Sequence, residues 1–189
     1  DSDSGGVERL KYIYSIDGGV NWSSYAILGT GDNNEISANM ICDLDGTLHL
    51  AWRKTNQIFY RKSINNGLNW NVEEDVDQLS GYSESFPKLS VDREGTIWLI
   101  WVGTDAANPY HQIKMRKKSR GTDTWSNYIC LTANNTCTQF MPYSVYAGPF
   151  HRRYNMQRGC AFVWTSDVNN PYDHFRFFKT QGAIFTETD

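Results

Sequence analysis

The sequence predicts an all-β protein, a β-propeller built of four-stranded antiparallel blades. Two observations predict this fold class. Aromatic residues make up 14% of the 189 residues, with 7 Trp and 11 Tyr, and such residues favour strands over helices. Strand-and-turn patterns also recur at intervals of about 48 residues, as between Trp22 and Trp70 or between Trp52 and Trp101. A repeat of roughly 40–50 residues with four short strands is typical of a propeller blade.

Length and charge exclude several classes of protein. A chain of 189 residues forms one domain or part of a larger repeat domain. Its 18 basic and 21 acidic residues give a net charge of −3, and a nucleic-acid binder needs a clear basic excess. No apolar run approaches the roughly 18–20 residues of a membrane helix, and the 4 His are scattered without metal-ligand spacing. We expect no membrane span, no nucleic-acid partner, no metal and no cofactor.

The first repeated element is a strand, an Asp-x-x-Gly turn and a second strand that ends in Trp. It occupies residues 41–52 and 90–101, and a weaker third copy ends at Trp164. In such a turn Gly supplies the positive φ, and the Asp side chain bonds the turn backbone. These hairpins are expected to form the first two strands of each blade.

The second repeated element is a turn of the form Ser-x-Asp-x-Gly-x-x-Trp that follows another strand. Its copies contain Ser15, Asp17, Gly19 and Trp22, then Ser63, Asn65, Gly67 and Trp70, and in shortened form Ser119 and Trp125. This motif resembles the Asp-box, or BNR repeat, of sialidase-like β-propellers. The resemblance implies a structural turn between the third and fourth strands of a blade, with the Trp buried between adjacent sheets and no ligand contact.

The repeats divide the chain into a partial propeller. A lead-in at residues 1–10 precedes a half-blade at 11–35 and blades at 36–80, 81–132 and 138–189. About three and a half blades would leave open sheet edges and an exposed apolar face. We therefore expect the rest of a longer chain or a homo-oligomer to complete the ring. A closed ring of four blades is the alternative, and it requires the C-terminus to supply the missing strands.

The four cysteines fall into two kinds by their place in the repeats. Cys130 and Cys137 flank a short loop between two blades, which makes a local disulfide an option. Cys42 and Cys160 fall on apolar positions of the repeat and are expected to be core thiols. Mainly because of the family resemblance, we expect an extracellular, cell-surface or virion-surface protein.

Candidate ligand-binding residues lie at the end of the blades opposite the Asp-box turns. The resemblance implies that this end is the ligand face. Two of its loops, 104–111 and 166–174, share an Asn-Pro-Tyr turn beside a carboxylate and an imidazole, which can hydrogen-bond and stack on a sugar. The candidates are Arg53, Asp105, Tyr110, His111, Asp167, Tyr172 and His174. The alternative is a repeated loop conformation whose Tyr packs on its neighbour.

The resemblance also implies the catalytic set of a sialidase, in which three Arg clamp a carboxylate beside a Tyr–Glu nucleophile pair and an Asp acid/base. This chain does not reproduce that set. It lacks an Arg-Ile-Pro motif, and Asn39, Lys88 and Tyr143 stand at the starts of the innermost strands where an Arg would serve. Glu84 beside Tyr82 is the one pair with catalytic chemistry, and a solvated link between blades is its alternative.

Three functions stay open at this point. The preferred hypothesis is a non-catalytic propeller module that binds a glycan or a surface protein. The next is a structural repeat scaffold in a large assembly. The third is part of a sialidase-like glycoside hydrolase whose remaining catalytic residues lie outside this sequence. Fold alone does not choose among them, because Asp-box propellers serve many roles.

Overall fold

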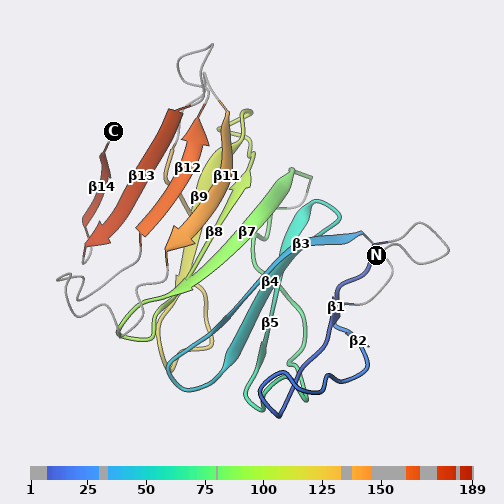
Figure 1. Ribbon diagram of the computed structural model, residues 1–189. Coiled ribbons are helices and arrows are strands. Elements are labelled where there is room, and N and C mark those ends of the chain that lie inside the picture. Colours follow the sequence, from blue (N-terminus) through green and yellow to red (C-terminus); the bar gives the residue numbers. More distant parts are fainter. Residues whose placement is uncertain are drawn as a thin grey trace.

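The computed structural model describes residues 8–29, 34–79, 81–132, 138–145, 161–166, 174–181 and 184–188. In these ranges the chain forms one two-stranded sheet and three four-stranded sheets, all antiparallel. Figure 1 shows the sheets following one another along an open arc, with the N- and C-termini at its opposite ends. The all-β class and the four-stranded antiparallel sheets are confirmed. No sheet closes on itself within these ranges, and the blade count stays a prediction.

Each sheet is a meander in which consecutive strands pair. The first contains β1 (Lys11–Tyr12) and β2 (Ala26–Ile27). The second contains β3 (Glu35–Cys42), β4 (Leu48–Lys54), β5 (Gln57–Ser63) and β6 (Glu74–Asp75). The third contains β7 (Glu84–Val91), β8 (Ile97–Gly103), β9 (Gln112–Lys118) and β10 (Ile129–Cys130). The fourth contains β11 (Gln139–Val145), β12 (Ala161–Ser166), β13 (His174–Gln181) and β14 (Ile184–Thr188).

The Asp-x-x-Gly turns have the chemistry that the sequence predicts. Asp43 Oδ1 accepts two backbone amides of the β3–β4 turn at 2.9 and 2.8 Å, and Asp92 Oδ1 accepts two amides of the β7–β8 turn at 2.9 Å each. Gly46 and Gly95 have φ of 82° and 81°, in the left-handed region that residues with a Cβ avoid. The carboxylate thus satisfies turn amides that strand pairing leaves free.

The Asp-box turns are held by the same kind of bond. In the first turn the Oδ1 atom of Asp17 accepts the amide four residues on at 2.9 Å, and Asn65 does the same at 2.8 Å in the second. The indole Nε1–H of Trp22 and that of Trp70 each donate to the carbonyl of the Gly three residues earlier, at 3.1 Å. Because an amide oxygen also accepts, Asn65 replaces Asp without loss of the bond.

Each Asp-box Trp that has a preceding sheet packs against it. Trp70 meets Tyr12 of the first sheet edge-on, with ring centroids 6.1 Å apart, and Trp125 meets Tyr60 of the second sheet at 5.1 Å. Trp22 has no such neighbour among the described residues and is 59% exposed. The expectation that Trp22 is buried is therefore wrong for this structure, because its box belongs to the first sheet of the arc.

Apolar side chains fill the space between consecutive sheets. Between the second and third sheets they are Ala51, Ile58, Tyr60, Val76, Leu89, Val91, Ile97, Leu99 and Trp101. Between the third and fourth sheets they are Trp98, Ile100, Val102, Ile113, Met115, Phe162 and Trp164. Strand β8 contributes alternate residues to both clusters, so it is buried on both faces and reads as a continuous apolar run.

Two of the four cysteines, Cys42 and Cys130, lie in the described residues. Cys130 lies on β10 and is partly buried, and Cys137 lies outside the described residues, so the disulfide between them stays a prediction. Cys42 is exposed rather than in the core, because it ends β3 next to the turn. Cys160 lies outside the described residues.

Within the described ranges no helix has the length and apolar character to cross a bilayer.

Candidate functional site

The turns divide between two ends of the sheets. Arg120, in the turn after β9, donates to Asp45 in the β3–β4 turn, so the Asp-box and Asp-x-x-Gly turns share one end. At the opposite end the backbone amide of Glu84 donates to the carbonyl of Asn56 in the β4–β5 turn at 2.9 Å. This second end, here called the loop end, also carries the β8–β9 loop at 104–111. It is where the sequence places the candidate ligand-binding residues.

A buried ion pair lies at the loop end of the third sheet. Glu84 begins β7, Lys114 lies on β9, and both side chains are fully buried. Lys114 Nζ donates to Glu84 Oε1 at 3.0 Å, and the indole Nε1–H of Trp101 donates to Oε2. Gly103, the residue paired with Glu84 across the sheet, leaves room for this carboxylate, since a Cβ there would stand 1.6 Å from Oε2. Glu84 therefore bonds Lys114 and Trp101, and Tyr82 lies partly buried in the preceding link.

Lys114 ties the β8–β9 loop to the sheet. Its Nζ also donates to the carbonyl of Thr104 at 2.5 Å and lies 3.4 Å from Asp105 Oδ2. Sequence reasoning missed Lys114. The signal was present, because the repeat aligns Lys114 on β9 with Phe59 on β5, and a cation at the position of a large apolar residue needs a buried counter-charge.

Two acids of this region, Glu84 and Asp77, have raised pKa values. Burial raises the pKa of Glu84 to about 7, although the nearby Lys114 cation and the hydrogen bonds it receives act the other way. Burial likewise raises the pKa of Asp77 to about 6, against the hydrogen bonds from the amides of Leu79 and Ile58. Both acids therefore titrate close to neutral pH. Acids with shifted pKa values are typical of functional sites, and they also occur in structural ion-pair networks.

Hydrogen bonds within the β8–β9 loop hold its turn, and the loop presents an exposed aromatic ring. Asp105 and Asn108 exchange backbone hydrogen bonds of 3.0 and 3.1 Å, and Asp105 Oδ1 accepts the amide of Ala107 at 3.0 Å. Burial would raise the pKa of Asp105, but Asn108 and Lys114 lower it below its usual value, so the carboxylate is ionised. Tyr110 is 45% exposed at the end of this loop. His111 is half-buried, and burial lowers its pKa, so its imidazole is neutral at pH 7.

The first strands of the three four-stranded sheets, β3, β7 and β11, are here called the inner strands. They carry a second set of exposed side chains at the loop end. The pairing of β3 with β4, of β7 with β8 and of β11 with β12 is shifted at the same place by a bulge. In the bulge of β7, Phe86 has φ of 53° and is 41% exposed. A bulky residue in that region is strained by roughly 1–3 kcal/mol, which often marks function. Two residues on, Lys88 Nζ lies 5.6 Å from the ring centroid of Tyr143, which is 57% exposed on β11.

The remaining predicted residues are not all brought together. Arg53 donates to Asn56 Oδ1 at 2.6 Å and so is held within its own β4–β5 turn. Asp167 and Tyr172 lie outside the described residues. His174 begins β13, and its side chain lies outside the description. Sequence reasoning missed Phe86, whose signal was the pair Phe86-Pro87 inside a strand that otherwise alternates.

Comparisons with known proteins show the fold. No family model and no curated protein matches the chain. Among solved structures it is similar to the GH93 α-L-arabinofuranosidase of Fusarium graminearum, with a TM-score of 0.55 and 14% identity over 77% of this chain and 45% of that one. It is also similar to the NanB sialidase of Streptococcus pneumoniae, with a TM-score of 0.54 and 17% identity over 84% of this chain and 24% of that one.

A third similar structure is the leech intramolecular trans-sialidase, with a TM-score of 0.54 and 14% identity over 93% of this chain and 28% of that one. The chain thus spans less than half the length of these three proteins. At such identities the likeness concerns architecture and not activity. The chain has the sialidase-like β-propeller fold.

Proposed function

We propose that this chain is part of a β-propeller that binds a glycan at its loop end without cleaving it. The observation that carries the proposal is the exposed ring of Tyr110, held on a loop that the Asp105–Lys114–Glu84 ion pairs fasten to the sheet. Aromatic rings stack on the C–H face of a sugar. A ring on a fixed loop loses little conformational entropy when it binds.

The other exposed groups at the loop end also fit a sugar. The neutral imidazole of His111 can donate and accept hydrogen bonds to hydroxyl groups. Phe86 and Tyr143 add exposed aromatic surface on the inner strands, with the Lys88 cation next to Tyr143. Two of the similar proteins were solved with sugars, the arabinofuranosidase with arabinobiose and the trans-sialidase with 2,7-anhydro-Neu5Ac. A surface protein that carries such a glycan would be a partner of the same kind.

The test is binding to a glycan array followed by calorimetry with the best ligand. We expect Tyr110→Ala to weaken binding at least tenfold, which corresponds to about 1.4 kcal/mol. Leu44→Ala is the control, because Leu44 is a large side chain of similar exposure, 37%, in the β3–β4 turn at the opposite end of the sheets. Equal affinity of Tyr110→Ala and the native protein would refute the proposed site.

Glycoside hydrolysis is the second candidate, and one observation favours it. Glu84 and Asp77 titrate near pH 7 and pH 6, in the range that suits a general acid or base. Because Glu84 is fully buried, this function requires the loop end to open. Release of a fluorophore from a sialoside or an arabinofuranoside, abolished by Glu84→Gln and retained by Glu94→Gln at the other end of β7–β8, would establish it.

We also propose that a further sheet covers the first sheet, supplied by the rest of a longer chain or by a second copy. The support is a run of exposed apolar side chains there, namely Ile13, Ile16, Val20, Trp22, Tyr25 and Ile27. Exposed apolar patches of this kind mark interaction sites. The intact mass of the native polypeptide and its mass in solution distinguish the two sources. A self-completing ring of copies would favour a scaffold, whereas glycan binding fits an extracellular, cell-surface or virion-surface location.

A further inference from the structure

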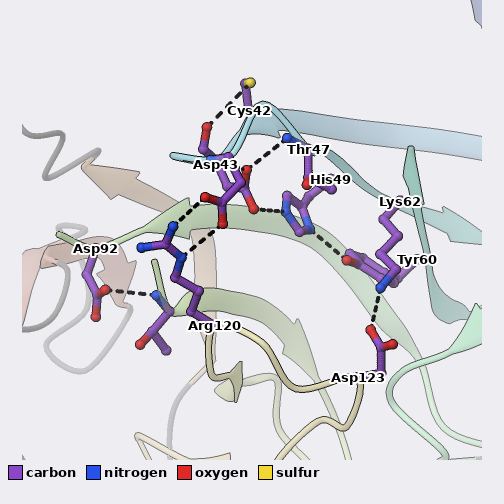
Figure 2. Close-up of polar contacts among 11 residues, drawn as sticks. Cys42, Asp43, Thr47, His49, Tyr60, Lys62, Asp92, Arg120 and Asp123 are labelled. Atoms are coloured by element: carbon purple, nitrogen blue, oxygen red, sulfur yellow. Dashed lines mark hydrogen bonds and ion pairs between the residues drawn. The ribbon is translucent and has the colours of Figure 1, made fainter. Parts of the chain in front are cut away.

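A second polar site lies at the opposite end from Tyr110. A pocket of about 230 Å³ opens between the second and third sheets, bounded by the β3–β4 turn, the end of β5 and the Asp-box turn after β9. Figure 2 shows the polar side chains around it. The volume is below the roughly 300–1,000 Å³ of pockets that enclose drug-sized ligands, and it suits a single ring.

Arg120 forms one wall of this pocket, in an ion pair with Asp45 whose two side chains are about half-exposed. Its Nε donates to Asp45 Oδ2 at 2.9 Å and its Nη2 donates to Oδ1, a bidentate pair that joins the two sheets. The stem of Arg120 lies over Gly95, where a Cβ would stand 2.6 Å from Cδ. Gly95 thus permits the close approach of the Arg120 stem.

A hydrogen-bonded chain forms the floor. Tyr60 Oη lies 2.6 Å from His49 Nδ1, and His49 Nε2 lies 3.0 Å from Asp43 Oδ2 (Figure 2). Burial lowers the pKa of His49 and raises that of Tyr60, so the imidazole is neutral, accepts from Tyr60 and donates to Asp43. In the third sheet Trp98 Nε1 donates to Asp92 Oδ2 in the same way. His49 therefore makes the bond to the turn aspartate that Trp98 makes in the third sheet, and it adds a bond to Tyr60.

The charges that line the pocket cancel one another. Three cations, Lys62, Lys118 and Arg120, stand among three carboxylates, Asp43, Asp45 and Asp123. Lys62 is bonded to Asp123, Arg120 to Asp45 and His49 to Asp43. The third cation, Lys118, lies 3.7 Å from Glu74 on β6, so each lining cation already faces a carboxylate and an ionic ligand would have to compete with one of these pairs. A hydroxyl group both donates and accepts, so it can bond the members of a pair without separating them.

We propose that this pocket binds one neutral, polyhydroxylated sugar ring. Hydroxyl groups of the ring bond the Arg120–Asp45 and Lys62–Asp123 pairs, and its C–H face lies against Ile64 and Ile97, which also line the pocket. This site does not rest on the loop-end site of the proposed function, because it lies at the other end of the sheets and uses none of its residues.

The experiment follows the methyl resonances of Ile64 and Ile97 in the purified protein during titration with D-galactose, D-mannose and N-acetyl-D-glucosamine. Ile58, at the loop end of β5, is the internal reference. We expect at least one of these sugars to shift the first two methyl groups and not the third. N-acetylneuraminic acid and D-glucosamine, which carry a charge, should bind at least tenfold more weakly.

Two variants locate the binding. Arg120→Met removes the bidentate wall and should weaken the neutral sugar at least tenfold. Lys117→Met is the matched control, since Lys117 is exposed on the adjacent β9 and does not line the pocket. Tyr110→Ala should leave this titration unchanged, which separates failure here from failure at the loop end. The absence of any shift with all three neutral sugars, equal binding of the charged sugars, or full binding by Arg120→Met would overturn the proposal.

Discussion

Lys114 Nζ lies 3.0 Å from Glu84 Oε1 in a pair that is entirely enclosed between β7 and β9. Lys114 is the first of three cations at alternate positions of β9. Arg116 reaches Gln78 of the segment after β6, and Lys118 lies 3.7 Å from Glu74 on β6. All three cations are buried, so this face of β9 joins the third sheet to the second partly through charge.

Loss of one member of the pair should be costly. Lys114→Met leaves the Glu84 carboxylate buried beside Trp101 without its cation, and we expect the free energy of unfolding to fall by about 3–5 kcal/mol. Urea unfolding followed by Trp fluorescence measures it. Lys117→Met, at an exposed position of the same strand, should change stability by less than about 0.5 kcal/mol. An unchanged midpoint for Lys114→Met would contradict the buried pair.

Stability should decline as pH rises towards neutrality. The folded pKa of Glu84, about 7, lies above its ordinary value of 4.5, and that of Asp77, about 6, lies above 3.8. Between these values the folded state binds more protons than the unfolded state, so the free energy of unfolding falls as pH rises through the window. The contribution of Glu84 is at most roughly 3 kcal/mol. Unfolding midpoints from pH 4.5 to pH 7.5 test it. Glu84→Gln should flatten the curve, and a native profile that rises with pH would be inconsistent with the raised values.

The two Asp-box tryptophans should differ. Trp70→Ala removes the contact with Tyr12, and we expect a loss of about 2–4 kcal/mol, somewhat less than a fully buried Trp. Trp22→Ala should cost below about 1 kcal/mol in the 189-residue chain, because the ring is 59% exposed. Thermal melts compare the two. A loss for Trp22→Ala as large as that for Trp70→Ala would show that another sheet covers Trp22 in solution.

The second Asp-box can be improved. Asn65 Oδ1 accepts the amide of Asn69 at 2.8 Å, where the first box uses the carboxylate of Asp17. A charged acceptor makes the stronger bond, so Asn65→Asp should stabilise the protein by about 0.5–1 kcal/mol at pH 7. Asn66→Asp, on the exposed tip of the same turn, is the control for the added charge. Destabilisation by Asn65→Asp alone would argue against equivalent turns.

Much of the fold could be predicted from the sequence because its signals are local. The Asp-x-x-Gly and Asp-box turns bond within four residues of themselves, so Asp43 and Asp17 behave as their motifs require. The place of Tyr110 on the loop between β8 and β9 was likewise predicted from the sequence. Phe86 was not, because a bulge that turns one residue outward depends on pairing with β8. Trp22 was expected to be buried because a motif does not state whether a neighbouring sheet is present.

By itself the sequence determined the all-β class, the four-stranded repeat and the chemistry of the turns, since each depends on residues close together in the chain. Only the tertiary structure decided which charges are buried. Lys114, Arg116 and Lys118 read as a basic strand, and packing against the second sheet encloses them beside Glu84 and Glu74. It also placed Arg120 against Asp45, a contact 75 residues apart that forms the pocket wall. Burial and charge pairing between sheets depend on distance in space, which no local pattern encodes.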